Sequence, residues 1–168
     1  MQSAAQLVAM LESSRAIFSA ALREAGESRA GARRAGEGWS VLQCAEHLAI
    51  VEDRFYRRFQ AAPSEGATPD DPAKEADLAK RILDRVHKAN APEMVQPSGM
   101  FATLAEAEAA FHAARDRMIG YVNATGEKLY TLAVEHPRFG KMNAAEMLVV
   151  LSGHTERHSE QIREILHG

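Results

Sequence analysis

Apolar residues recur every three or four positions in four long segments of this chain, and this spacing constrains the fold more than any other feature. The spacing places the apolar side chains on one face of an α-helix, which must then be buried against another element. No segment shows the alternation of apolar and polar residues that is typical of a strand, so the chain is predicted to be all-α. The four predicted helices cover residues 4–25, 40–62, 103–124 and 143–168.

The ends of these segments carry helix-capping signals. Gly26 follows the first segment, where a glycine readily takes the backbone conformation that ends a helix. The other three segments begin with a Ser, Thr or Asn whose Gln or Glu partner stands three residues later, which is the pattern of a capping box. These pairs are Ser40 with Gln43, Thr103 with Glu106, and Asn143 with Glu146.

Four amphipathic helices of about 20 residues favour a four-helix bundle. About 40 residues separate the second helix from the third, whereas adjacent antiparallel helices usually need only about 2–8. This crossover is predicted to hold one short extra helix at 74–88, between a Pro-rich acidic stretch at 62–73 and an irregular segment at 90–102. Its length allows the second and third helices to run parallel. The predicted bundle is therefore up-down-down-up, with its second and fourth helices as antiparallel neighbours.

Length, charge and cysteine content restrict what such a bundle can be. A chain of 168 residues is expected to form a single domain, 1–168, whose core needs no disulfide or structural metal. The single cysteine, Cys44, allows no internal disulfide. A net charge of −3 argues against a nucleic-acid partner. No long apolar run suggests a membrane span, and the first residues do not resemble a signal peptide, so we expect a cytoplasmic protein.

His154 and His158 lie four residues apart in the last predicted helix, one turn apart on a face that also carries apolar residues. His47 borders the apolar face of the second helix and also lies near the middle of its helix. In antiparallel neighbours the three imidazoles would therefore lie at similar depth. Three imidazole ligands leave a coordination position open, which is typical of a catalytic metal site. In the metal-free alternative, His47 is a satisfied core residue and the other two are half-exposed beside Glu156 and Glu160.

Two carboxylates and one amide stand near these histidines in the sequence. Glu52 and Glu160 either orient an imidazole or, as charged residues on a helix more often do, point into solvent. Gln161 is one turn beyond His158 on its inner face and is a candidate for orienting that ring.

Three further residues have roles that the sequence leaves open. Cys44 lies one turn before His47, but a free cysteine more often acts as a small buried hydrophobe. Trp39 is expected to cover the end of the bundle, and the alternative is that it lines a pocket mouth. His136 is expected on the surface of the loop 125–142, and the alternative is again that it lines the pocket.

The order and spacing of these residues resemble those of a known family. The resemblance rests on Gly38-Trp39-Ser40 before the second helix, His47 seven residues later, His136-Pro137 with Phe139-Gly140, and the final His154, His158, Gln161 and Ile162. Over nearly its whole length the chain resembles the DinB-like (DinB/YfiT) superfamily of metal-binding four-helix bundle proteins. The resemblance implies an up-down-down-up bundle, often dimeric, that binds a divalent metal through His47, His154 and His158.

The resemblance also implies a chemistry. Several members are metal-dependent transferases or isomerases that use a low-molecular-weight thiol such as bacillithiol, mycothiol or glutathione. We therefore expect a divalent metal, zinc or nickel before iron, that activates a thiol or water for transfer to, or hydrolysis of, a small electrophile. The expected partners are a small-molecule substrate or thiol cofactor and a second copy in a homodimer. One alternative is a non-enzymatic dimeric bundle that binds metal or responds to stress, and another is a bundle whose three histidines bind nothing. No catalytic residue is identified.

Overall fold

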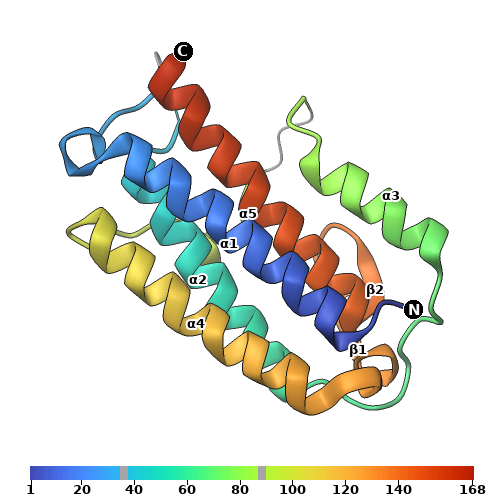
Figure 1. Cartoon of the computed structure of the whole chain (residues 1–168). Helices are drawn as coiled ribbons and strands as arrows, with labels where there is room; N and C mark the ends of the chain where they lie inside the picture. Colours follow the sequence, from blue (N-terminus) through green and yellow to red (C-terminus); the bar gives the residue numbers. More distant parts are fainter. Residues whose placement is uncertain (35–37, 87–89) are drawn as a thin grey trace.

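Each long helix of the bundle begins at a side chain that caps it. The computed structural model describes residues 1–34, 38–86 and 90–168. Capping boxes at Ser3, Ser40, Thr103 and Asn143 each place a side-chain oxygen against a backbone N–H three residues later. The four helices are α1 (Ala4–Ala25), α2 (Val41–Gln60), α4 (Leu104–Thr125) and α5 (Ala144–His167) (Figure 1). All four predicted helices are confirmed, to within two residues at each end.

The four long helices run up, down, down and up. α1 packs beside α5 and α2 beside α4, and the two helices of each pair run in the same direction (Figure 1). α2 and α5 also contact each other and run in opposite directions, as predicted. The long crossover carries the chain back along the bundle between α2 and α4, which is why these two helices can be parallel. The predicted architecture is confirmed.

The crossover contains the short helix α3 (Pro72–Leu83), which packs against α5. Asp71 caps its first turn, and a proline stands at its first position. The predicted range of 74–88 extended too far, because the backbone becomes extended at Asp84; residues 87 and 88 lie outside the described residues. The described residues also form the 3₁₀ helices η1 (Glu27–Arg29), η2 (Glu93–Val95) and η3 (Gly126–Thr131).

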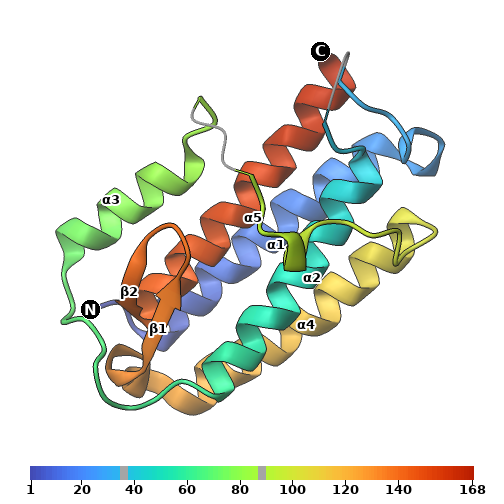
Figure 2. The ribbon, with the colours of Figure 1, turned by 180° about the vertical axis from the view of Figure 1, so that it is seen from behind.

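The prediction that the chain has no strands is wrong for the segment before α5. Two short antiparallel strands, β1 (Ala133–His136) and β2 (Gly140–Asn143), form a hairpin there. Each has only four residues, which is too few for an alternation to be recognised in the sequence. Val134 and Met142 face each other across the pair and are buried in the core. The hairpin contacts α5 near its beginning (Figure 2).

A buried arginine connects all four long helices. Arg115 of α4 has no solvent exposure and forms a bidentate ion pair with Glu52 of α2, at 2.5 and 3.0 Å. The same guanidinium donates to the Leu11 carbonyl and the Ser14 hydroxyl of α1, and to the Thr155 hydroxyl of α5. Glu52 is thus neither in solvent nor bonded to a histidine, and both roles expected for it are wrong. Its partner is 63 residues away, where no local pattern reveals it.

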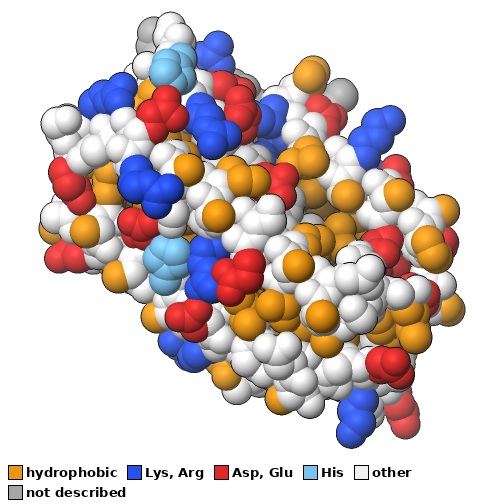
Figure 3. All heavy atoms as spheres, viewed as in Figure 1, with side chains coloured by type: hydrophobic (Ala, Val, Ile, Leu, Met, Phe, Trp, Pro, Cys, Tyr) orange, Lys and Arg blue, Asp and Glu red, His pale blue; other side chains and the backbone are white. Residues whose placement is uncertain are grey.

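One face of the molecule mixes both signs of charge. On the face viewed in Figure 3, Lys and Arg side chains are interspersed with Asp and Glu, and hydrophobic side chains lie between them. Among the described residues, we find no helix with both the length and the apolar content that a membrane span requires.

Candidate metal centre

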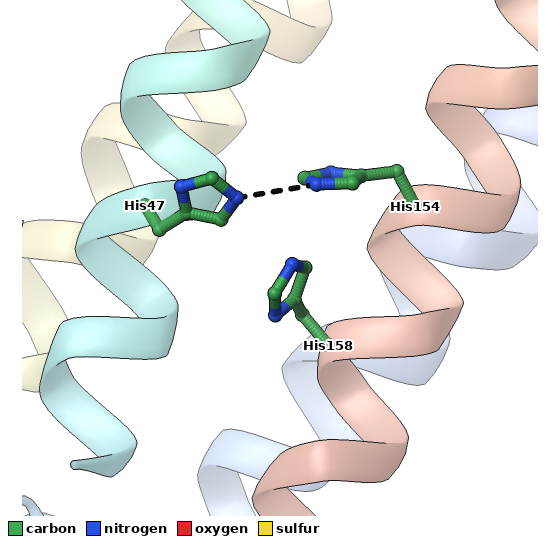
Figure 4. A group of neighbouring side chains, drawn as sticks. All are labelled: His47, His154 and His158. Carbon is green, nitrogen blue, oxygen red and sulfur yellow. Dashed lines mark hydrogen bonds between the residues drawn. The ribbon is translucent and has the colours of Figure 1, made fainter. Parts of the chain in front are cut away.

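Three histidines from two antiparallel helices meet inside the bundle. His47 projects from α2 toward α5, and His154 and His158 project from successive turns of α5 toward α2 (Figure 4). One nitrogen of each ring lies within 4.8 Å of those of the other two. The shortest separation, 3.1 Å, joins Nε2 of His47 to Nε2 of His154, which are 107 residues apart in the sequence. The structure therefore brings together the three residues that the sequence predicted as ligands.

The surroundings keep these imidazoles neutral. Burial lowers the pKa of His47 from its usual 6.5 to about 4. The pKa values of His154 and His158 both lie well below the usual value. Burial is the larger cause, and the neighbouring imidazoles are the second. Neutral imidazole is the form that binds metal ions, so at neutral pH none of the three must lose a proton before coordination.

Two hydrogen bonds determine which nitrogen of His47 and of His158 faces the cluster. The Nδ1–H of His47 donates to the carbonyl of Val95 at 2.7 Å, and the Nδ1–H of His158 donates to Oε1 of Gln161 at 2.9 Å. In a neutral ring this leaves Nε2 as an acceptor. Contacts of this kind hold metal-ligating histidines in place, and Gln161 makes the contact for which it was a candidate.

His154 shows that a cation suits this cluster. Its Nε2 faces that of His47, and its buried Nδ1 has no hydrogen-bond partner in the described part of the chain. When the proton of His154 is on Nδ1, the Nε2 lone pairs of His47 and His154 face each other with no donor between them, which is costly inside a protein. A cation between the facing Nε2 atoms would satisfy both lone pairs. Two nitrogens on one tetrahedral zinc ion are about 3.3 Å apart, so the His47–His154 pair fits a divalent ion, and a nitrogen of His158 lies within 4.8 Å of both.

A buried carboxylate supports the segment that orients His47. Glu46, next to His47 in α2, has no solvent exposure. Its Oε1 accepts the backbone N–H groups of Ser98, Gly99 and Met100 at 2.7, 3.1 and 3.1 Å. These bonds fix the irregular segment just after Val95, whose carbonyl holds the imidazole. Sequence reasoning missed Glu46, because its partners are 52 to 54 residues away and lie in a loop.

Trp39 lies against the histidines rather than only over the end of the bundle. Its ring centroid is 4.7 Å from that of His47 and 5.9 Å from that of His158, with the latter pair stacked at 22°. Cys44 lies in the apolar core, where burial raises the pKa of its thiol to about 12. Glu160 is 55% exposed and pairs with Arg163 at 3.6 Å. Of these three, only Trp39 adjoins the site.

The histidines open onto a cavity of about 820 Å³ between α2, α5, the segment around η2 and the hairpin. His136 lines this cavity, so the expectation of a surface loop histidine is wrong. Its ring stacks against those of Phe55 and Phe139, with centroids 6.1 and 4.8 Å away. Burial, and then the charges of Arg58 and Arg138, lower its pKa to about 4. The hairpin that places it there is the element that sequence analysis did not predict.

Comparisons with known proteins agree with this architecture. Residues 10–162, which include all three histidines, match the family model of the DinB superfamily. Among solved structures, the chain is similar to YfiT from Bacillus subtilis, described as a probable metal-dependent hydrolase with an unusual four-helix bundle topology. The two chains are 17% identical, with a TM-score of 0.67 over 98% of this chain and 86% of that one. At that identity the likeness shows the fold. The curated proteins gave no match.

Proposed function

The chain belongs to the DinB superfamily, and on that premise we propose that it is a divalent-metal-dependent enzyme acting on a small electrophile. His47, His154 and His158 hold the ion, which is zinc or nickel before iron. The ion would supply Lewis acidity, which lowers the pKa of a thiol or of water and so makes a nucleophile at neutral pH. The reaction is transfer of a low-molecular-weight thiol to the electrophile or its hydrolysis.

The observation that carries the proposal is a cluster of three neutral imidazoles on the wall of a large cavity. A structural metal site is closed by protein ligands, whereas a catalytic site keeps a position open to small molecules. Within the described residues, the clustered ligand group consists of three histidines and no cysteine or carboxylate. An open cavity beside three ligands supports an enzyme over the alternative of an inert metal-binding bundle.

The chain's own side chains can prepare the substrate. Val95 and Gln161 orient the imidazoles of His47 and His158 through hydrogen bonds. The Trp39 ring lies against both imidazoles and shields them from bulk water. Nδ1 of His136 accepts the backbone N–H groups of Arg138 and Phe139 at 3.1 and 3.3 Å. The ring proton of neutral His136 is therefore held at Nε2, where it is available as a hydrogen-bond donor on the cavity wall.

The hydrolase arm of the proposal is supported by the description of YfiT as a probable metal-dependent hydrolase. The transferase arm is an expectation from the sequence motifs. A homodimer and a cytoplasmic location likewise stay predictions. Gel filtration tests the homodimer, because it distinguishes the mass of one chain from that of two.

A rate assay on the metal-loaded protein tests the proposal. Protein loaded with zinc or nickel is tested for hydrolysis of activated esters, and for conjugation of glutathione and related thiols to an aryl halide. We expect turnover that requires metal and falls by about 10²-fold or more in the His158→Ala variant, because one ligand of the ion is lost. Variant His112→Ala, which changes a histidine outside the cavity lining, should keep the wild-type rate. The proposal would be contradicted if the rates with and without metal were equal for every ester and for every combination of thiol and aryl halide.

Glu46 offers a prediction about metal affinity. Replacing Glu46 with Gln puts an amide NH₂ where an oxygen now accepts backbone N–H groups, so the segment that carries Val95 should loosen. We expect metal affinity to fall by about tenfold, measured by competition with a chromophoric chelator. The control is Glu93→Gln, an exposed residue of the same segment. If both variants bind metal equally well, the support assigned to Glu46 is wrong.

A further inference from the structure

The cavity beside the histidines is rich in arginine although the chain as a whole is acidic. Six arginines line it, Arg34, Arg54, Arg58, Arg85, Arg138 and Arg157, and Glu164 is the one carboxylate among the described lining residues. The chain has 20 Lys and Arg against 23 Asp and Glu. On the face in Figure 3 the two signs are mixed. The cavity lining therefore carries more positive charge than the face in Figure 3 and than the chain as a whole.

At one end of the cavity the arginines are already occupied. Arg85 forms two bonds to the Glu164 carboxylate, at 2.6 and 2.8 Å, and Arg34 lies 3.5 Å from the same group. Arg157 donates to the backbone carbonyls of Ile82 and Asp84. These contacts account for the arginines near the end of α5.

At the other end lie Arg54, Arg58 and Arg138, which we call the arginine end. In the described part of the chain none of the three forms an ion pair with a carboxylate. Arg54 contacts the sulfur of Met94 at 3.0 Å, and Arg58 donates to the backbone carbonyl of Glu135 at 3.0 Å. By contrast, two arginines that do not line the cavity, Arg57 and Arg117, share the carboxylate of Asp53.

Aromatic rings hold the arginine end in place. The guanidinium of Arg58 lies 5.3 Å from the centre of the Phe55 ring, and that of Arg138 lies 5.3 Å from the centre of the Phe139 ring. Phe55 and Phe139 both stack against His136. A guanidinium over an aromatic face keeps its N–H donors free at its edge, where they can form paired bonds to a carboxylate or phosphate.

The arginine end is on the same side of α2 as the candidate metal centre. Arg54 and Arg58 follow His47 by seven and eleven residues, which returns them to the same helix face. At 1.5 Å per residue these positions are about 10 and 16 Å along the helix axis from His47. A small molecule can therefore reach from the histidines to the arginine end.

We propose that the substrate carries an anionic group, a carboxylate or a phosphate, which the arginine end binds while the reactive end of the molecule lies at the three histidines. The proposal rests on the proposed function and names the substrate class for it. The paired donors of Arg58 and Arg138 recognise two oxygens of one anionic group, and the cavity surface between them and the histidines holds the connecting carbons.

The test compares an acid with its amide. The probes are 8-mercaptooctanoate and 8-mercaptooctanamide, whose sulfur and terminal carbon are about 10 Å apart when extended. Both are titrated into protein loaded with Co²⁺, in which a sulfur-to-cobalt charge-transfer band reports thiol binding. We expect the acid to bind about tenfold or more tightly than the amide. This preference for the acid should vanish in the Arg58→Gln/Arg138→Gln double variant and persist in the Arg57→Gln variant. The amide should bind the wild-type protein and both variants with equal affinity.

A second titration separates this proposal from the metal centre. Octanoate, octyl phosphate and octanamide are titrated by calorimetry into chelator-treated protein and into the double variant. If either anion binds more tightly than the amide, and the double variant loses this preference, the proposal is supported. That holds even if the protein never binds cobalt. Failure to bind cobalt would refute only the proposed function. The tighter of the two anions identifies the group. The proposal would be overturned if the protein binds cobalt but has equal affinity for the anionic probes and the amides in both titrations. A preference for the anionic probes that survives in the double variant would overturn it too.

Discussion

Replacing His154 with alanine is expected to reduce bound metal from about one ion per chain to less than about a tenth of an ion. His154 supplies the Nε2 that faces His47 at 3.1 Å, so its loss leaves two ligands on different helices. Elemental analysis of untagged protein, purified without chelator and then offered zinc or nickel, measures the change. The His167→Ala variant is the matched control, because His167 is in the same helix, exposed and paired with Glu24.

Two outcomes would count against this account of the site. Full metal retention in the His154→Ala variant would place the ion elsewhere. Metal-free wild-type protein after loading would leave the bundle without the proposed centre. The second result would favour the interpretation in which the three histidines bind nothing.

Replacing Arg115 with methionine is expected to cost about 3–5 kcal/mol of the free energy of unfolding, because Glu52 is left as a buried charge without a partner. Three neutral groups, the Leu11 carbonyl and the Ser14 and Thr155 hydroxyls, lose their donor as well. For a chain of this size the melting temperature should fall by about 6–20 °C. Urea unfolding followed by circular dichroism measures the loss.

The control for this variant is Arg117→Met, two residues along α4. Arg117 is 46% exposed and pairs with Asp53 at the surface, so its replacement should cost no more than about 1 kcal/mol. Adding Glu52→Leu to Arg115→Met should recover part of the lost stability, because it removes the unpaired charge. If Arg115→Met is no more harmful than Arg117→Met, the buried ion pair does not hold the four helices as described.

Much of this fold follows from local sequence signals. Capping pairs such as Asn143 with Glu146 depend only on residues three apart, so they indicate where a helix begins without reference to the rest of the chain. The position of His47 near the middle of its helix, matched to His154 and His158 in an antiparallel neighbour, likewise follows from helical periodicity. These two kinds of signal were sufficient to predict the bundle architecture and the clustering of the three histidines.

Most of the features that sequence analysis missed depend on contacts between distant segments. Arg115 and Glu46 look like ordinary helix charges until their partners on other elements are known. His136 looks like a loop residue because its hairpin has strands of only four residues. The arginine end is invisible in the sequence, since Arg138 joins Arg54 and Arg58 only when the hairpin packs near α5 and α2.

X-ray absorption spectroscopy on the zinc-loaded protein tests the central claim most directly, because it counts the imidazole ligands of the bound ion. The account predicts three imidazole nitrogens at about 2.0–2.1 Å, with the remaining position taken by a light atom from solvent. Addition of a small thiol should replace that light atom with sulfur at about 2.3 Å. Fewer than three imidazoles, or a sulfur ligand before any thiol is added, would contradict a centre formed by His47, His154 and His158 that is open to the cavity.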